Sequence, residues 1–192
     1  MTMTVCCPPP TAIASVVTTL NPCPQTLGQI DKVIFWRRGN YMSVASASVS
    51  TAWTTRFEST GTDKAVASPF LGNVEMPVPD PREFGGGNET VRGASIRRGN
   101  LSTKFSGRIY QADQDTIAYL KDLMCETLDV LFFNEANEII YREVGTDCYG
   151  FPVTKGSLFL SDKHIGGLEE ADYNILSFNL RPNWSNSLKI VS

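Results

Sequence analysis

The chain has 192 residues, of which 42% are hydrophobic and 19% are charged. This balance is typical of a globular protein and excludes a chain that is disordered throughout. The length allows one domain with a sizeable core and extended appendages. The formal net charge of −3 excludes a broad basic surface, and therefore argues against tight nucleic-acid binding through phosphate contacts.

The cysteines form no recognisable disulfide or metal-binding pattern. An odd number of cysteines without CxxC spacing makes a poor disulfide framework and a poor zinc site. We therefore expect reduced thiols in a reducing compartment. The cysteines are Cys6, Cys7, Cys23, Cys125 and Cys148.

Residues 1–28 are expected to form an extended Pro-rich arm, because their prolines exclude regular helix and remove donors from strand pairing. The apolar run Ala12–Leu20 within this arm is short, contains Ser and Thr, and follows no basic segment. It therefore predicts neither a membrane span nor a signal peptide. Its larger apolar residues fit one side of a helical turn and also a loose strand: Ile13, Val16, Val17 and Leu20.

Residues 29–38 predict the first strand, since an aromatic and β-branched centre is bounded by charged residues and closed by a Gly-Asn pair. Both faces of this strand carry large apolar side chains, so we expect it to be covered on both sides for part of its length. These side chains are Val33 and Phe35 on one face, and Ile34 and Trp36 on the other.

The next segment contains a short helix. Its Ser and Thr content also suits strand or loop, but Val49, Trp53 and Phe57 recur at the i, i+4, i+8 spacing of one helix side. We predict a helix over Ser50–Glu58, a break at residues 60–63, and a strand near residues 64–68.

A stretch of some thirty residues from Pro69 to Gly99 has no helical period and is rich in Pro and Gly. Connections of this length are uncommon in compact domains unless they are functional or disordered. We expect a projecting arm or long hairpin at about residues 60–100 that a partner orders. The run Gly85–Gly87 is interpreted as a sharp bend, because neither GK[ST] nor a helix follows it, as a phosphate-binding loop would require.

Residues 101–110 alternate between apolar and polar side chains, which predicts a half-buried strand. The strongest helix prediction follows over Ala112–Leu128, with acidic residues at its start. Its apolar stripe comprises Ile117, Leu120, Met124 and Leu128.

The last third of the chain is predicted to be β-structure. The expected strands are residues 130–133 and 138–142 as a hairpin, then 156–160, 173–180 and 188–191, with a turn at 181–186. Residues 29–192 then form a single β-rich domain of α+β, mainly β, class. The expected architecture is a β-sandwich or partly closed barrel with one main flanking helix and long extended arms.

The sequence shows no catalytic constellation. His164 is the only histidine, no GxSxG or HExxH is present, and a polar loop residue is the favoured interpretation. Carboxylates gather at Glu169, Glu170 and Asp172, with Asp162 upstream. A solvated acidic loop is the default interpretation; a pore lining and an acid–base hydrolase are the alternatives. We expect no enzymatic activity, no metal and no cofactor.

Short basic pairs and the acidic loop suggest contacts between subunits more than a nucleic-acid groove. Together with an aromatic residue and a glycine of the long arm, they make up the predicted inter-subunit contact set. The set is Arg37, Arg38, Phe84, Gly86, Arg97, Arg98, Glu169 and Glu170.

Several stretches resemble virion structural proteins of tailed bacteriophages, most of all tail tube proteins. They are NPCPQTLGQIDKVIFWRRG, PDPREFGGGNET, KDLMCETLDVLFF and FNLRPNWSNSLKIV, which together span most of the chain. The resemblance lies in composition and order, without a signature motif.

The resemblance implies a β-sandwich or barrel with a flanking helix. It implies self-assembly into rings, commonly hexameric, which stack as a tube through which DNA passes without specific binding. Other tail proteins would be partners, arms would bridge the rings, and there would be no membrane anchor. The protein would be assembled in the bacterial host cytoplasm and reside in the virion tail. A capsid-decorating or head–tail joining protein is the alternative.

Overall fold

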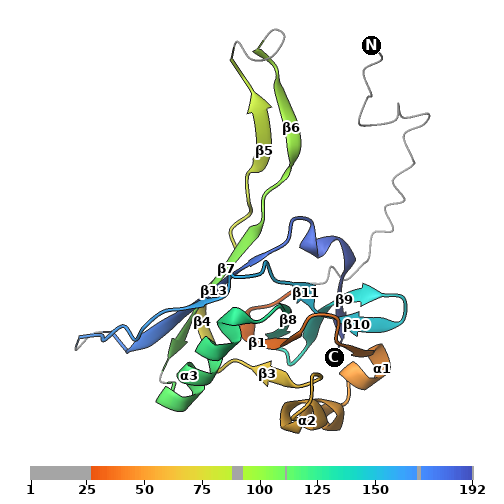
Figure 1. Cartoon of the computed structure of the whole chain (residues 1–192), viewed down its shortest axis with the longest axis vertical. Helices are drawn as coiled ribbons and strands as arrows, with labels where there is room; N and C mark the ends of the chain where they lie inside the picture. Colours follow the sequence, from red (N-terminus) through yellow and green to blue (C-terminus); the bar gives the residue numbers. More distant parts are fainter. Residues whose placement is uncertain (1–26, 88–92, 111, 168–169, 192) are drawn as a thin grey trace.

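The computed structural model describes residues 27–87, 93–110, 112–167 and 170–191. The Pro-rich arm expected for residues 1–28 lies almost wholly outside the described residues, as does Glu169. The described strands form a large sheet, a smaller sheet packed on it, and a separate two-stranded hairpin that projects from the body (Figure 1). The mainly β class with one main flanking helix is therefore confirmed.

The large sheet has eight strands among the described residues, in the order β2-β10-β9-β8-β1-β3, with β11 beside β8 and β14 beside β9. The central strand β1 pairs antiparallel with β8 and β3. The bounds are β1 Ile30–Arg37, β2 Tyr41–Ser43, β3 Ala65–Ala67, β8 Leu128–Asn134, β9 Ile139–Val144, β10 Asp147–Tyr149, β11 Phe151–Pro152 and β14 Leu188–Val191.

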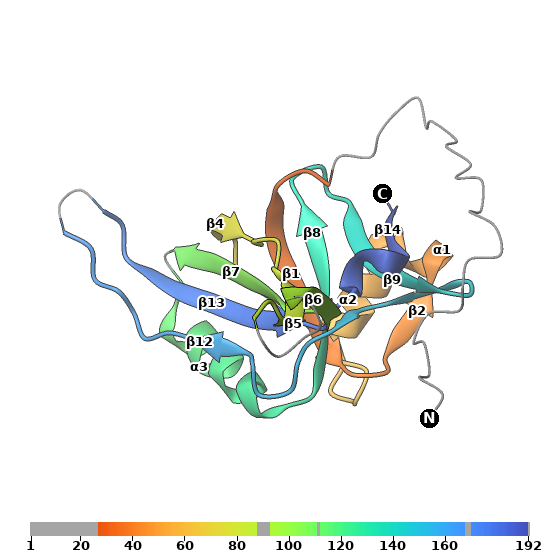
Figure 2. The same cartoon turned by 90° about the horizontal axis from the view of Figure 1, so that it is seen from above.

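The smaller sheet has the order β12-β13-β7-β4 and lies across one face of the large sheet (Figure 2). Its long pair is β13 with β7, in register from Tyr173 opposite Tyr110 to Leu180 opposite Thr103. The bounds are β4 Leu71–Glu75, β7 Thr103–Tyr110, β12 Phe159–Leu160 and β13 Tyr173–Leu180. The two-stranded hairpin consists of β5 Pro81–Gly85 and β6 Ser95–Asn100.

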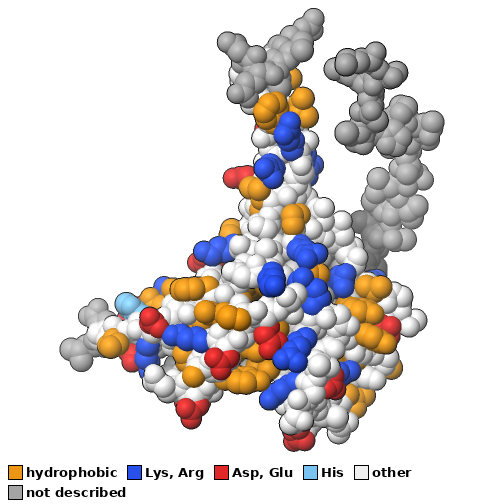
Figure 3. Space-filling view, in the orientation of Figure 1, with side chains coloured by type: hydrophobic (Ala, Val, Ile, Leu, Met, Phe, Trp, Pro, Cys, Tyr) orange, Lys and Arg blue, Asp and Glu red, His pale blue; other side chains and the backbone are white. Residues whose placement is uncertain are grey.

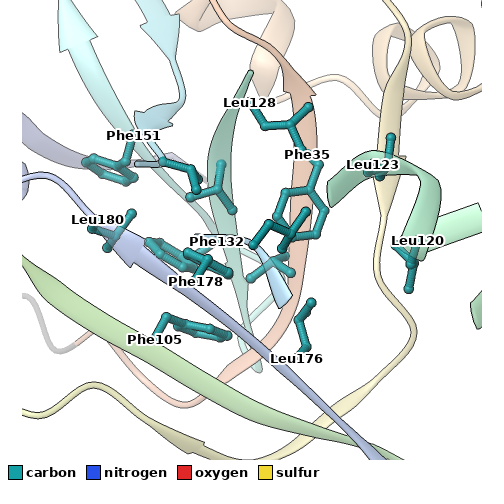
Figure 4. Packing of buried hydrophobic residues seen from close by; sticks show 14 of the residues in the cluster. Phe35, Phe105, Leu120, Leu123, Leu128, Phe132, Phe151, Leu176, Phe178 and Leu180 are labelled. Carbon is teal, nitrogen blue, oxygen red and sulfur yellow. The ribbon is translucent and has the colours of Figure 1, made fainter. Parts of the chain in front are cut away.

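Two apolar clusters hold these layers together, one on each face of β1. Val33 and Phe35 face the smaller sheet, where Phe178 stacks on Phe105 with ring centroids 4.6 Å apart (Figure 4). Ile34 and Trp36 face the opposite way, and Trp36 stacks on Trp53 at 5.9 Å. The expectation that β1 is covered on both faces is confirmed.

The helices pack at two places on this sandwich. Helix α2 (Ser50–Glu58), preceded by the single turn α1 (Val44–Ala47), lies over the outer face of the large sheet and has the predicted bounds. Helix α3 (Gln114–Asp122) continues into the 3-10 turn η2 (Leu123–Cys125) and packs Leu120 and Leu123 into the core between the sheets.

The predicted end of the main helix at Leu128 was wrong. Asp113 caps the helix at its start, where its carboxylate accepts a hydrogen bond from the Thr116 N–H at 2.7 Å. At the other end, Leu128 already belongs to β8 and pairs with Arg37 of β1. Sheet pairing therefore overrides the apolar spacing that continued the helical pattern.

Two other expectations needed correction. The stretch from Pro69 to Gly99 is not one projecting segment, because Leu71–Glu75 forms β4 and Leu71 is buried in the core. The strand expected over residues 156–160 is reduced to Phe159–Leu160, since Gly156 has a φ of +74° and the Ser157 N–H bonds back to the Thr154 carbonyl. The short 3-10 helix η3 (Trp184–Ser187) occupies the predicted turn before β14.

Candidate functional site

The β5–β6 hairpin, here called the hairpin arm, stands clear of both sheets (Figure 1). All residues of β5 and all of β6 except Asn100 are exposed. Its register runs from Pro81 opposite Asn100 to Gly85 opposite Ser95, with a bulge between Arg82 and Glu83. In the described part of the chain no third strand pairs with it. The arm therefore presents both outer backbone edges and both faces to its surroundings.

An ordered patch of apolar and cationic side chains lies on this arm. Phe84 and Ile96 stand opposite each other across the hairpin and are 39% and 57% exposed. The guanidinium of Arg98 lies over the Phe84 ring, 4.2 Å from its centroid. A cation stacked on an aromatic face is a favourable contact. It fixes the directions of two side chain types that are enriched at protein–protein interfaces.

The tip of the arm turns through glycines. Gly85 and Gly86 have φ values of +97° and +95°, which side chain-bearing residues rarely adopt. Within the predicted bend at Gly85–Gly87, the backbone angles at Gly85 and Gly86 therefore require glycine. Residues 88–92, which follow the bend, lie outside the described ranges.

Polar bonds fasten the root of the arm to the body. The Arg97 guanidinium donates to the Asn100 side chain, which in turn donates to the side chain of Asn183. Next to them, Trp184 donates its indole N–H to the Thr103 hydroxyl at 3.1 Å. Trp184 also packs on the core ring of Phe151, with centroids 5.1 Å apart. The arm is therefore held at its base by groups that contact the core.

A second projection, here called the acidic arm, lies between β12 and β13 and comprises the described residues 161–167 and 170–172 (Figure 2). His164 and Tyr173 exchange backbone hydrogen bonds at its start, and their rings lie 4.6 Å apart. The Arg108 guanidinium lies over the Tyr173 ring, 4.3 Å from its centroid, and pairs with Glu170 at 3.1 Å. Tyr173 and Glu170 thus organise the arm around Arg108.

Asp162 and Asp172 of the predicted acidic loop also have partners in their own chain. Lys121 pairs with Asp162 at 2.6 Å and holds the pKa of that carboxyl below its usual range. Asp172 accepts the Gly166 N–H at 2.9 Å. No group of three or more His, Cys, Asp or Glu residues in the described ranges could hold a metal ion. The carboxylates serve as anchors of the acidic arm in this arrangement.

Arg37 ends β1, Arg38 follows it, and both side chains contact their own chain. Arg37 forms a bidentate pair with Glu126 at 2.8 and 2.9 Å. Arg38 pairs with Asp129 at 3.0 Å and donates to two backbone carbonyls. The structure thus divides the predicted contact set. Phe84, Gly86, Arg97 and Arg98 share the hairpin arm, whereas Glu170 lies on the acidic arm.

Several exposed apolar side chains near the arms were not singled out by sequence reasoning. They include Val78 before β5, Leu101 after β6 and Ile165 on the acidic arm. The space-filling view shows Lys and Arg side chains along the hairpin arm and around its root, interspersed with apolar ones (Figure 3). Val78 lies between two prolines in the sequence. This position excludes a core helix, but it does not predict that the Val78 side chain is exposed.

The hairpin root also borders a groove of about 700 Å³, lined by Pro and Met side chains of residues 76–81 and by the turn at residues 183–186. A second groove of about 400 Å³ opens on the outer face of the large sheet, beside α2. None of the helices in the described part is both long and apolar enough to span a bilayer.

No protein-family model matches this chain, and no curated protein matches its sequence. Its fold is similar to chains in three solved structures. In the C6-symmetric tail of an empty gene transfer agent particle, a chain is 14% identical with a TM-score of 0.35, covering 65% of this chain and 88% of that one. In the native gene transfer agent virion, a chain is 17% identical with a TM-score of 0.32, covering 64% of this chain and 85% of that one. In the six-fold symmetrised anti-feeding prophage baseplate, a chain is 9% identical with a TM-score of 0.38, covering 88% of this chain and 97% of that one.

Proposed function

We propose that this chain is a non-enzymatic structural subunit that assembles with copies of itself into hexameric rings, which stack as a bacteriophage tail tube. DNA passes through the lumen without specific binding, and other tail proteins bind the ends. The observation that carries the proposal is the hairpin arm, an exposed ribbon with a fixed root and an ordered apolar and cationic patch. The resemblance of the sequence to tail tube proteins supports the same assignment.

An isolated two-stranded hairpin is at best marginally stable in water. Its unpaired edges are also templates for pairing with another chain. The hairpin arm combines both properties with the exposed Phe84 and Ile96 side chains. Contact with a neighbouring subunit would bury these two side chains and satisfy the free backbone edges. The hairpin arm is therefore expected to be more stable in an assembly than in an isolated subunit.

The two sheets offer further surfaces for a neighbour. In the described residues, β3 pairs only with β1, and β4 pairs only with β7. Each strand therefore leaves one outer edge for sheet-to-sheet pairing. The net charge of −3 suits a channel through which a polyanion must move without binding.

Within this assembly, the contact residues act at two places. Phe84, Gly86, Arg97 and Arg98 of one subunit meet its neighbour through the hairpin arm. Glu169 and Glu170 on the neighbour's acidic arm offer the complementary charge. Arg37 and Arg38 already pair inside their own chain. They contact the neighbouring subunit through the guanidinium N–H donors that these pairs leave unused.

Electron microscopy of the concentrated full chain tests the proposal, with rings or tubes as the expected result. The matched variant replaces Glu83–Arg98 with Asn-Gly, a two-residue link suited to joining the paired residues Arg82 and Gly99. This variant should keep the circular dichroism and unfolding transition of the parent but remain monomeric. A monomeric parent under all conditions, or a variant that still forms rings, would overturn the proposal.

Co-sedimentation separates this function from its alternative. The full chain is mixed with empty capsids or with purified tail fractions. Association with tails and with itself supports the tail tube. Saturable binding to capsids by a chain that never self-assembles would instead indicate a decorating or head–tail joining protein, and would overturn the proposal.

A further inference from the structure

The groove beside α2, here called the outer groove, has apolar walls. Ile34 and Ile139 of the large sheet form its floor, and Trp53 and Phe57 of α2 form one wall. Phe133 and Val191 complete the opposite side, and Lys32 is the charged residue among its lining. Its volume of about 400 Å³ is open to solvent along one side. An apolar surface of this kind gains free energy when another apolar segment covers it.

The described chain begins next to this groove. The Leu27 carbonyl accepts a hydrogen bond from the Asn134 side chain at 3.0 Å, and the Glu135 N–H donates to the Gln29 carbonyl at 3.0 Å. Asn137, in the same turn between β8 and β9, is one of the groove's lining residues. The segment that precedes Leu27 therefore emerges at one end of the outer groove.

That preceding segment has the composition to fill the groove. Residues 1–28 contain no Asp, Glu, Lys or Arg, so burying part of them removes no charge from water. The apolar residues of Ala12–Leu20 lie at i, i+3, i+4 and i+7, the spacing of one side of a helix. Residues 21–26 can span up to about 20 Å when extended, which lets Leu20 reach over the groove.

We propose that Ala12–Leu20 docks in the outer groove of its own chain, with Ile13, Val16, Val17 and Leu20 against Trp53, Phe57 and Phe133. The docked segment would cover the outer apolar cluster and fix α2 on the sheet. This inference does not depend on the tail tube proposal. It concerns a contact within one chain, and it is tested on protein diluted to the monomeric state.

The groove side is tested with two neighbouring threonines of α2. Thr54 lines the outer groove, whereas Thr55 lies on the other side of the helix, near Tyr41 and Arg56. Both hydroxyls donate to the carbonyl four residues earlier, Thr54 to Ser50 and Thr55 to Thr51. Thr54→Asp and Thr55→Asp therefore remove the same type of helix hydrogen bond, and Thr54→Asp alone places a charge in the groove.

The segment side is tested with Val17→Asp and its control Thr18→Asp. In a helical Ala12–Leu20 segment, Thr18 lies off the side formed by Ile13, Val16, Val17 and Leu20. Thr18→Asp should unfold at the same urea concentration as the parent, whereas Val17→Asp should lose the stabilisation that docking adds to the folded state.

The measurement is the rate of chymotrypsin cleavage after Leu20 in the full chain, followed by mass spectrometry. Cleavage should be at least about tenfold faster in Thr54→Asp and in Val17→Asp, because proteolysis follows the population of the undocked segment. Thr55→Asp and Thr18→Asp should match the parent. Equal rates in all five proteins would overturn the proposal. Protection of the parent that disappears on dilution would also overturn it, by assigning the groove to another copy.

Discussion

The carboxylate of Asp129 on β8 accepts a hydrogen bond from the Arg38 Nε at 3.0 Å, and its side chain is only 2% exposed. The same carboxylate accepts the Gly39 N–H at 3.2 Å. Arg38 also donates to the Leu128 and Val153 carbonyls, at 3.2 and 2.5 Å. This ion pair therefore ties the end of β1 to β8 and to the chain that leaves β11.

Asp129→Ala should lower the free energy of unfolding by about 3–5 kcal/mol, because it leaves the Arg38 cation without its buried partner. Urea denaturation of the parent and variant measures the difference. Asp63→Ala is the matched control, because Asp63 pairs with Arg56 at the surface and its loss should change stability far less. Equal effects of the two substitutions would contradict this role for Asp129.

Acidification should weaken the link between Arg37 and Glu126. The hydrogen bond and charge of Arg37 hold the pKa of Glu126 below its usual range. A carboxyl with a lowered folded-state pKa contributes stability above its unfolded-state pKa of about 4.3, and that contribution is lost as the pH falls through the lowered value. Urea midpoints across pH 7 to 3 should therefore fall less steeply in Glu126→Gln than in the parent. Parallel curves would show that the pair contributes nothing.

The Cys148 thiol should be unreactive in the folded protein. Burial raises its pKa to about 12, so the thiolate is absent at pH 8. Peptide mapping after iodoacetamide treatment at pH 8 should find the exposed Cys125 modified and Cys148 unmodified until denaturant is added. Because burial keeps the Cys148 thiol neutral, this thiol contributes to the free energy of unfolding below its unfolded-state pKa of about 8.5. The contribution declines as the pH rises above that value. Labelling of Cys148 at the rate of Cys125 would show that β10 opens readily.

Phe178→Ala should destabilise the core between the two sheets by about 3–5 kcal/mol. The Phe178 ring is 1% exposed and contacts Phe105 face to face and Phe35 edge on (Figure 4). Phe159→Ala provides the control, since Phe159 is 53% exposed on the neighbouring strand β12. Thermal unfolding of both variants should show a large decrease for Phe178→Ala and a small one for Phe159→Ala.

Comparison of the two arms shows where sequence reasoning reached its limit. Pro and Gly content predicted a projection at about residues 60–100, because these residues set backbone angles locally, and the β5–β6 hairpin lies within that range. The same reasoning treated residues 161–172 only as an acidic loop. The bridge between His164 and Tyr173 extends this loop as a second arm. It was not predicted, because residues 161–167 show no alternation of apolar and polar side chains that would indicate a strand.

The contact set illustrates the same division. Phe84, Gly86, Arg97 and Arg98 were grouped in sequence and remain together, because a hairpin keeps near neighbours in register. Arg37 and Arg38 were grouped with them by charge. The structure joins them to Glu126 and Asp129, some ninety positions away in the chain.

The sequence by itself determined the elements whose signals are local. Strands β1 and β13, helix α2 and the β8–β9 hairpin follow from alternation, helical spacing and turn residues within a few positions of one another. The tertiary structure alone decided the rest. It ended the main helix before Leu128, placed Leu71–Glu75 in a sheet, formed the short strands β2, β10 and β11, and shaped the outer groove. Each of these depends on pairing or burial between distant segments, whose energy is gained only when both partners are in place.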